Sequence, residues 1–375
     1  MAKRILSAAV ALLLVLVLAG CSILNNPSAT VFTAQESESF GPYKHYFNTL
    51  DDNGKRAYNA ILEEIENFPE KIEVPQLNND ELEQVWLALM YDNPELIMFG
   101  RECMLSSENR KFWFSCDYAM SKEDYDQKKA ELQAKTDSFA AELAKKESAF
   151  DKELFIHDTL IDMCEYMSSE DIIYSTPYGV LVNGKASCEG YAKAAKLLLD
   201  RAGIENHLIC GTAKRGDGES EGHMWNIVYL DGRPYNLDLT WDDPVGEEVS
   251  QNRRYAYFNV TDAEILKTHT FSDSAACCVA TDYNYFVKLG RQFDAYDANM
   301  RSSLAEIFKG HKSGDKIDIR FSTEEVYKQA VKGLFENEEV YRVLSVAAVG
   351  KRSFSTKQIK YIADDEHFII EFILV

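Results

Sequence analysis

The chain has 375 residues, of which 46% are hydrophobic and 27% are charged, so it can bury a sizeable core like an ordinary globular protein. Its formal net charge is −21, from 61 acidic and 40 basic residues, which argues against nucleic acid and against anionic lipid bound by charge. We therefore expect a soluble, folded protein with one main domain and accessory segments.

The first residues predict a targeting segment. Two basic residues precede an apolar run over 5–18, which is short for a membrane-spanning helix. The run ends in LAGC, a sequence similar to the bacterial lipobox, in which the cysteine receives the lipid. We expect 1–20 to be a lipoprotein signal peptide and Cys21 to carry fatty acyl chains such as palmitate. The expected location is the extracytoplasmic face of the cell membrane, and the alternatives are an ordinary signal peptide or a membrane helix.

The next residues predict a tether and a small accessory region. Residues 21–40 are polar and lack periodicity, so they are expected to be flexible. Residues 41–120 carry two helical patterns, one capped near Asp52 and one capped at Asn79, followed by a strand over 110–118. We interpret 41–120 as a mainly helical N-terminal accessory region.

The eight cysteines form no Cys-x-x-Cys pair of the kind that binds zinc. Cys103 and Cys116 flank a short aromatic segment and could face each other across a hairpin. A disulfide between them is one expectation, and two reduced thiols are the other. We interpret the remaining cysteines as mostly buried and reduced.

Residues 121–290 are expected to form the main domain, and Cys188 stands at the start of one of its helices. Apolar residues recur at helical spacing after Cys188, and Gly203 ends the pattern. The free N–H groups and the positive dipole end of a helix favour a thiolate and could hold an oxyanion. Gly190 is expected to keep this helix start open to a substrate. The alternative is a buried and inert cysteine.

A histidine and an aspartate follow on a predicted hairpin. The run from His223 to Leu230 is rich in strand formers, Asp231-Gly232 predicts a two-residue turn, and 233–240 predicts the returning strand. In this register His223 and Asp238 share one face of the sheet as diagonal neighbours, within reach of a hydrogen bond. A thiol nucleophile needs such a pair, because the imidazole moves the proton and the carboxylate orients the imidazole.

The segments GKASCEGYAKA, GHMWNIVYLDG and YNLDLTWDDP resemble the transglutaminase-like superfamily, in its bacterial branch with a papain-like fold. The resemblance is specific over about 178–244. It implies that Cys188 is the nucleophile, His223 the general base and Asp238 the orienting acid. It also implies an α+β fold in which the helix that carries the cysteine packs on an antiparallel sheet. Members of the superfamily include acyltransferases that cross-link proteins, proteases, peptide amidases and proteins without known activity.

Two aromatic residues are further candidates for the site. An aromatic or amide side chain upstream of the cysteine commonly completes the oxyanion site of such enzymes, and Tyr178 is the candidate here. Trp241 directly follows the aspartate strand and could form a wall of the cleft. For both residues, packing in the core is the alternative. His269 is interpreted as a lone loop histidine, and nothing nearby in the sequence suggests a metal.

Residues 291–375 predict a small α+β appendage. Strands are expected at IDIRF and FIIEFILV, with a capped helix at STEEVYKQAVKGLF between them. The last strand is strongly apolar and is expected to be buried in a sheet. The appendage contains no catalytic pattern.

Together these patterns predict a surface-anchored, thiol-dependent amide hydrolase or acyltransferase that works through a thioester. Its expected partners are a peptide, protein or cell-wall peptide substrate and the membrane, reached through Cys21. Neither nucleic acid, a metal nor an organic cofactor is expected, and the chain is expected to be a monomer. The first alternative is a catalytically silent binding or scaffold protein of the cell envelope. A redox or metal protein is a second alternative, which lacks the paired Cys or His spacing.

Overall fold

The computed structural model describes residues 43–216, 218–243, 255–272, 276–349 and 353–375. The predicted signal peptide, the tether and Cys21 lie outside these residues. The chain divides into two compact units, the first formed by Met1–Thr240 with Asp262–Cys278, and the second by Trp241–Thr261 with Val279–Val375. In the described residues no helix is both long and apolar enough to cross a membrane. The predicted domain boundaries stay predictions.

Several helices of the first unit begin at side chains that cap them. Asn78 and Glu81 form a reciprocal capping box at one helix start, and Asp51 accepts the Gly54 N–H at another. Each of these caps lies one residue before the position predicted from the sequence. The α-helices of the described chain up to residue 202 are α1 (His45–Thr49), α2 (Asp52–Glu64), α3 (Asn79–Asp92), α4 (Lys122–Leu143), α5 (Ala149–Met163) and α6 (Cys188–Ala202).

An antiparallel sheet of three strands, one before α3 and two after it, has the strand order β1-β3-β2. Its strands are β1 (Ile72–Val74), β2 (Phe99–Glu108) and β3 (Lys111–Tyr118). Cys103 and Cys116 are directly opposite each other on β2 and β3, as expected, and both are free thiols.

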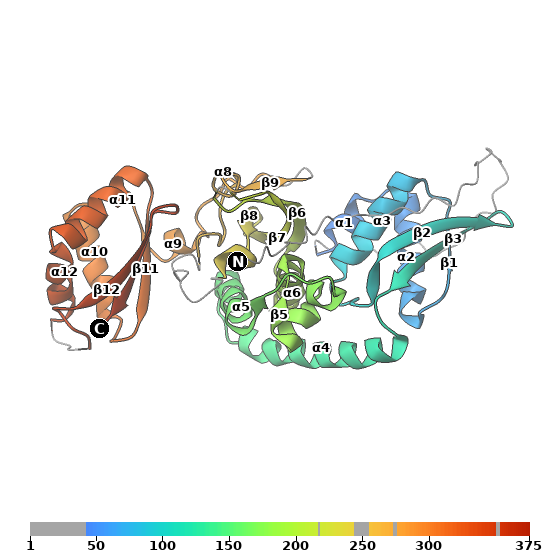
Figure 1. The fold of residues 1–375 in the computed structure, drawn as a ribbon, viewed down its shortest axis with the longest axis horizontal. Coiled ribbons are helices and arrows are strands. Elements are labelled where there is room, and N and C mark those ends of the chain that lie inside the picture. The colour runs from blue at the N-terminus through green and yellow to red at the C-terminus, as the bar shows by residue number, and fades with distance from the viewer. Residues whose placement is uncertain (1–42, 217, 244–254, 273–275, 350–352) are drawn as a thin grey trace, which may run out of the picture. The chain divides into compact units, whose positions relative to one another are not determined.

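A four-stranded antiparallel sheet with the order β8-β7-β6-β9 forms the centre of the first unit. Its strands are β6 (Asn206–Ala213), β7 (Glu221–Leu230), β8 (Arg233–Leu237) and β9 (His269–Phe271). Helix α6 packs against β6 and β7 (Figure 1), and Asn226 of β7 donates to the Ala192 carbonyl of α6 at 3.0 Å. This arrangement confirms the predicted α+β organisation of a cysteine-bearing helix on an antiparallel sheet.

The predicted hairpin register is correct for β7 and β8, but the second strand is shorter than expected. Leu230 pairs with Arg233 and Asn226 pairs with Leu237, across a turn in which Asp231 and Gly232 both have positive φ. β8 ends at Leu237, and the helical turn α7 (Leu239–Asp242) follows where a strand to residue 240 was expected. Aspartate is a poor strand former, and the Asp238 side chain forms a hydrogen bond with His223, outside the strand ladder.

Shorter elements surround the start of α6. They are β4 (Glu165–Tyr166), the 3-10 helix η2 (Ile172–Ser175), the π-helical turn η3 (Gly179–Asn183) and β5 (Lys185–Ala186). β4 and β5 pair in parallel, with Tyr166 opposite Ala186. This pairing places the backbone of residue 166 next to the chain that enters the cysteine helix.

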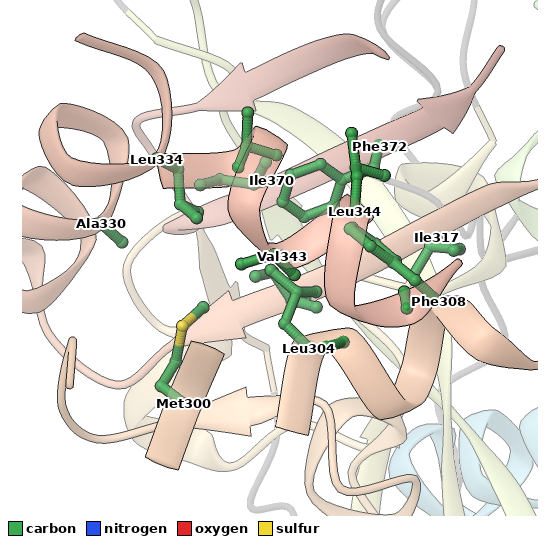
Figure 2. Close-up of a cluster of buried hydrophobic side chains, with 14 of the residues drawn as sticks. Met300, Leu304, Phe308, Ile317, Ala330, Leu334, Val343, Leu344, Ile370 and Phe372 are labelled. Atoms are coloured by element: carbon green, nitrogen blue, oxygen red, sulfur yellow. The ribbon is translucent and has the colours of Figure 1, made fainter. Parts of the chain in front are cut away.

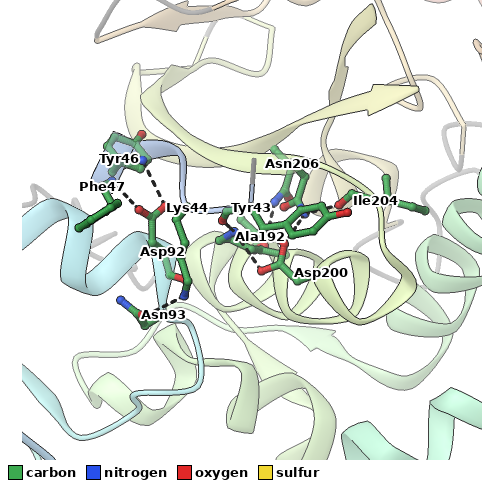
Figure 3. A network of polar contacts seen from close by, with 12 residues as sticks. Tyr43, Lys44, Tyr46, Phe47, Asp92, Asn93, Ala192, Asp200, Ile204 and Asn206 are labelled. Atoms are coloured by element: carbon green, nitrogen blue, oxygen red, sulfur yellow. Dashed lines mark hydrogen bonds and ion pairs between the residues drawn. The ribbon is translucent and has the colours of Figure 1, made fainter. Parts of the chain in front are cut away.

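Buried polar contacts attach the N-terminal helices to α6 (Figure 3). The Lys196 ammonium of α6 donates to the Tyr43 carbonyl at 2.9 Å and pairs with Asp200 at 3.0 Å. Lys44 donates to the Asp92 carbonyl at 2.7 Å, and the Asp92 carboxylate accepts the Phe47 N–H at 2.7 Å. The described residues from 43 to 119 therefore belong to the same packed body as the cysteine helix.

The second unit is built around a mixed sheet with the order β10-β11-β13-β12. Its elements are α9 (Tyr285–Lys288), β10 (Gln292–Phe293), α10 (Ala298–Lys309), β11 (Lys316–Phe321), α11 (Glu324–Val331), α12 (Glu339–Ala347), β12 (Ile359–Asp364) and β13 (Ile369–Leu374). Side chains of β11 and β13 meet those of the three longer helices in one apolar cluster, which includes Leu304, Phe308, Ile317 and Phe372 (Figure 2). The predicted strands and helix of the appendage are confirmed.

Candidate active site

Cys188 is the first residue of α6, as the sequence predicts, and it is buried. The residue before it, Ser187, has the backbone angles of a helix cap but makes no capping bond with its side chain. Its hydroxyl instead lies 3.2 Å from the Ser175 hydroxyl and 3.3 Å from the Tyr174 carbonyl. The N–H groups of the first turn are therefore not taken by the usual capping side chain, which leaves donors for an anion beside the thiol.

Gly190 is required for a different reason from the one expected. A Cβ at this position would lie 2.5 Å from the Tyr174 carbonyl oxygen and 2.8 Å from the Ala186 Cβ. The chain's own η2 segment therefore approaches the helix at this point, and the glycine does not keep the helix start open to a substrate. The close approach holds the segment before Cys188 against the first turn of α6.

His223 lies between the thiol and a carboxylate. Its Nε2 is 2.6 Å from Oδ2 of Asp238, and the Cys188 thiol is close enough to raise the pKa of the imidazole. Burial alone would lower the pKa of His223, but the Asp238 charge and the contact with Cys188 reverse this effect and raise the pKa to about 10. The imidazole therefore favours its protonated form at neutral pH, as in an ion pair with the Asp238 carboxylate.

Asp238 follows the last residue of β8, and only 1% of it is exposed. Burial would raise the pKa of its carboxyl, but the charge and hydrogen bond of His223 and the hydrogen bond of His269 hold it well below its usual range. An ionised carboxylate only accepts hydrogen bonds, so both imidazoles must present N–H groups to it. The structure thus brings together Cys188, His223 and Asp238, the three residues expected to do the chemistry.

A second histidine on the same carboxylate was missed by sequence reasoning. His269 begins β9, its side chain is fully buried, and its Nε2 lies 3.0 Å from Oδ2 of Asp238. Its Nδ1 lies 2.8 Å from the Thr268 hydroxyl, which can donate to it. β9 has only three residues, too short a run for alternation to be recognised, so the histidine was interpreted as a lone loop residue.

Tyr166 is another residue near the site that the sequence did not indicate. Burial first, and then the charges on Cys188 and Glu221, raise the pKa of this tyrosine to about 12. Its strand β4 pairs with β5, two residues before the thiol. The phenol is therefore close enough to respond to charge on the sulfur, and only long-range pairing of two-residue strands places it there.

The two aromatic candidates from the sequence have other partners. The Tyr178 hydroxyl donates to Glu131 of α4, and the Lys128 ammonium lies 5.2 Å from the centre of its ring. Trp241 is buried and meets the Tyr257 ring edge-on at 5.2 Å. The roles of Tyr178 at an oxyanion site and of Trp241 in a cleft wall stay predictions.

A small cavity lies beside the residue that follows the thiol. It has a volume of about 90 Å³ and is lined mainly by apolar side chains of α3, of the approach to β2 and of η2, among them Trp86, Ile97 and Phe99. Glu189 and Lys193 of α6 also line it, and they form an ion pair at 2.7 Å with about a tenth of each side chain exposed. The cavity is therefore apolar on one side and charged on the side of α6.

The Asp238 carboxylate and the two imidazoles beside it also have the spacing of a metal site. His223, Asp238 and His269 offer nitrogen and oxygen atoms within 4.8 Å of one another. Both imidazoles, however, use Nε2 toward one carboxylate oxygen at hydrogen-bond distances. A metal ion would have to displace both bonds and would remove the base from the thiol, so the described geometry fits proton transfer better.

Comparisons with known proteins agree on one family. The model of the transglutaminase-like superfamily matches residues 137–239, which include Cys188, His223 and Asp238. The human kyphoscoliosis peptidase is 29% identical over 89 residues, which cover 22% of this chain and 13% of that protein. The chain therefore matches only a small part of this curated relative.

Solved structures give more distant similarities. One described as a TGase is 15% identical, covering 53% of this chain and 56% of that chain with a TM-score of 0.27. A candidate cysteine protease from Cytophaga hutchinsonii is 17% identical, covering 40% of this chain and 56% of that chain with a TM-score of 0.25. At the family level, the match to the superfamily model supports a thiol-dependent hydrolase or transferase. Residues 137–239 of this chain are thus identified as a transglutaminase-like domain.

Proposed function

We propose that this protein is a surface-anchored thiol enzyme that hydrolyses amide bonds or transfers their acyl group through a thioester. The observation that supports this most directly is the position of His223, which bonds the Asp238 carboxylate at 2.6 Å and contacts Cys188. This is the set of contacts that a thiol nucleophile needs for activation.

In the proposed first step, the Cys188 sulfur attacks the carbonyl carbon of an amide. The thiol proton resides on His223, and Asp238 stabilises the imidazolium. When the tetrahedral intermediate collapses, the C–N bond breaks and the imidazolium protonates the leaving amine. The products of this half-reaction are the free amine and an acyl group bound to sulfur as a thioester.

In the second step, the thioester is attacked by water or by an amine. His223 takes a proton from the attacking group, and the C–S bond breaks. The proton is then held again between His223 and the released sulfur of Cys188. Water yields a carboxylic acid, as in a protease or amidase, and a lysine amine yields a new amide, as in a transglutaminase. Neither route requires a metal or an organic cofactor.

Two local features would support these steps. The N–H groups at the start of α6 lack a capping bond from Ser187, so they can donate to the oxyanion that forms in each tetrahedral intermediate. The apolar cavity beside Glu189 offers room for a side chain of the substrate near the nucleophile. We propose a peptide, protein or cell-wall peptide as substrate, held near the membrane by lipid on Cys21.

The proposal is tested with the full chain and Cys188→Ala, each incubated with cell-wall peptides and with casein plus a primary amine. Mass spectrometry would detect hydrolysis as new termini and transfer as incorporation of the amine. We expect one of these products with the wild type and none with Cys188→Ala. Equal product profiles for the two proteins would contradict the proposal.

Thiol reactivity gives a test that needs no substrate. At mildly acidic pH, iodoacetamide should alkylate Cys188 faster than a free thiol, and His223→Ala should abolish the difference. A wild-type rate no higher than that of a free thiol, unchanged by His223→Ala, would favour the silent binding protein.

A further inference from the structure

We propose that His269 is a positioning residue of this site, which fixes the Asp238 carboxylate so that His223 stays aligned with Cys188. The inference rests on the proposed function, because it assigns a role in activating the same thiol. It extends the Cys-His-Asp set by a fourth side chain, from a strand far along the chain. No contact of His269 with the reacting atoms is invoked.

The two imidazoles share one acceptor atom. Nε2 of His223 and Nε2 of His269 lie 2.6 Å and 3.0 Å from the same oxygen, Oδ2 of Asp238. Their ring centres are 5.2 Å apart, and the ring planes are inclined by 58°, so the rings approach the oxygen from different directions. Two donors from two directions define the position of that oxygen, whereas one donor would let the carboxylate rotate about it.

The carboxylate lies just beyond the end of a strand. β8 ends at Leu237, and Asp238 is the next residue. Contacts of the Asp238 side chain therefore contribute to its position. His269 supplies one of these contacts from β9, which is the edge strand opposite to β8 in the sheet.

His269 is itself held rigidly. Its Nδ1 lies 2.8 Å from the Thr268 hydroxyl, and its Nε2 lies 3.0 Å from Oδ2 of Asp238, so both ring nitrogens have a polar partner. The Trp225 ring meets it edge-on at 5.3 Å, and none of its side chain is exposed. These contacts hold the ring in the orientation that directs Nε2 to the Asp238 carboxylate.

The backbone beneath this histidine is also closely packed. Ala213 of β6 pairs with His269, and Gly211 of β6 pairs with Phe271. A Cβ on Gly211 would lie 2.0 Å from the Thr270 carbonyl oxygen, so β9 can approach β6 only at a glycine. The sheet thus places the second histidine at the carboxylate by strand pairing, and not by chance contact of a loop.

The first experiment reads the proposed hydrogen bonds directly. The chain has seven histidines, which can be labelled with nitrogen-15 in the imidazole ring and assigned by single substitutions. We expect Nε2 of His269 to carry a proton with a strongly deshielded N–H signal. In His269→Gln this signal should disappear while that of His223 remains. An Nε2 of His269 without a proton would overturn the proposal.

The second experiment measures alkylation of Cys188 by iodoacetamide across pH, in the full chain. His269→Leu removes the donor, whereas the amide of His269→Gln can replace it. We expect His269→Leu to react roughly ten-fold more slowly near neutral pH and His269→Gln to stay within about three-fold of the wild type. His311→Gln, which changes a histidine of the second unit, serves as the matched control.

The outcomes separate this proposal from the proposed function. If wild-type reactivity depends on His223 but is the same in His269→Leu, the enzyme remains and the positioning role is wrong. If reactivity does not depend on His223, both proposals fail. If His269→Leu does not fold, the labelling result and the recovery in His269→Gln decide. Stoichiometric zinc in the purified protein, with alkylation accelerated by a chelator, would overturn the role in favour of a metal site.

Discussion

The apolar cluster of the second unit and the polar cluster of the first unit are both buried, but they are stabilised in different ways. Around Leu304 and Phe372, aliphatic and aromatic side chains pack together and exclude water (Figure 2). The stabilisation that results does not depend on the direction of each contact. Around Asp238, burial is tolerated only because each polar atom meets a partner at a defined distance. The first region tolerates similar shapes, whereas the second depends on the exact chemical group.

This difference predicts opposite responses to small substitutions. Removing atoms from the apolar cluster should lower stability and spare chemistry, because no reacting group is there. Replacing a polar atom near Cys188 should abolish or alter chemistry at a smaller cost in stability. The following predictions test this contrast, from the largest expected effect to the smallest.

The largest effect is expected for the nucleophile. Cys188→Ser should lower amide hydrolysis or transfer by on the order of 10³-fold or more, because a hydroxyl is a far weaker nucleophile beside this imidazole. The measurement is the initial rate of product formation by mass spectrometry. Cys277→Ser, at an exposed thiol, is the control and should keep the wild-type rate.

Next, Leu304→Ala should lower the free energy of unfolding of the second unit by about 2–5 kcal/mol, because it leaves a cavity in a fully buried cluster. Denaturant titration measures this loss. The alkylation rate of Cys188 in the folded protein should stay within about two-fold of the wild type. A large drop in that rate would show that the two regions are not energetically independent.

Acid should destabilise the protein through a buried histidine outside the active site, His207, which stacks on His45. The His45 and His207 rings stack at 3.7 Å, and burial, with the charges of His45 and Lys196, lowers the pKa of His207 to about 3. The unfolded chain binds a proton at this histidine below about 6.5, while the folded chain does not until about 3.

Stability should therefore be lost as pH falls through this window, by up to about 1.4 kcal/mol per pH unit. His207→Phe keeps an aromatic ring and removes the titration, so its free energy of unfolding should fall less over the same range. Urea titrations at several pH values provide the comparison. Parallel pH curves for the two proteins would mean that His207 already binds its proton in the folded state.

The smallest effect is expected at Tyr166. If its phenol donates to charge that develops near Cys188, Tyr166→Phe should lower kcat about five- to ten-fold with little change in KM. The fold should be unaffected, since the ring is kept. Tyr178→Phe, which loses a bond to Glu131 of α4, is the matched comparison and tests the residue that the sequence favoured. A larger loss for Tyr178→Phe would restore the original assignment.

The sequence was sufficient for the parts of the site that depend on local pattern. The helix at Cys188, its end at Gly203 and the turn at Asp231-Gly232 all follow from residue preferences, and the structure has them. The contact between His223 and Asp238 followed from the register of that turn. The length of β8 did not follow, because hydrogen bonds of the Asp238 side chain end the strand.

Sequence reasoning failed where long-range pairing decides. His269 reaches Asp238 through a three-residue strand, and Tyr166 reaches the cysteine helix through a two-residue strand. Such strands are too short to show alternation, and their partners are distant in the chain. Gly190 was recognised as special, but only the folded chain shows that the Tyr174 carbonyl is its reason.

The buried Lys196 ammonium has a practical consequence for dissecting this protein. It is on the helix that begins with Cys188, and one of its acceptors is the Tyr43 carbonyl, far upstream in the chain. A shortened protein that starts at residue 121 would keep the nucleophile but leave this cation facing solvent or an unfilled gap. Activity measured on such a fragment would report on a damaged scaffold, so the smallest piece suited to enzymology includes the N-terminal helices.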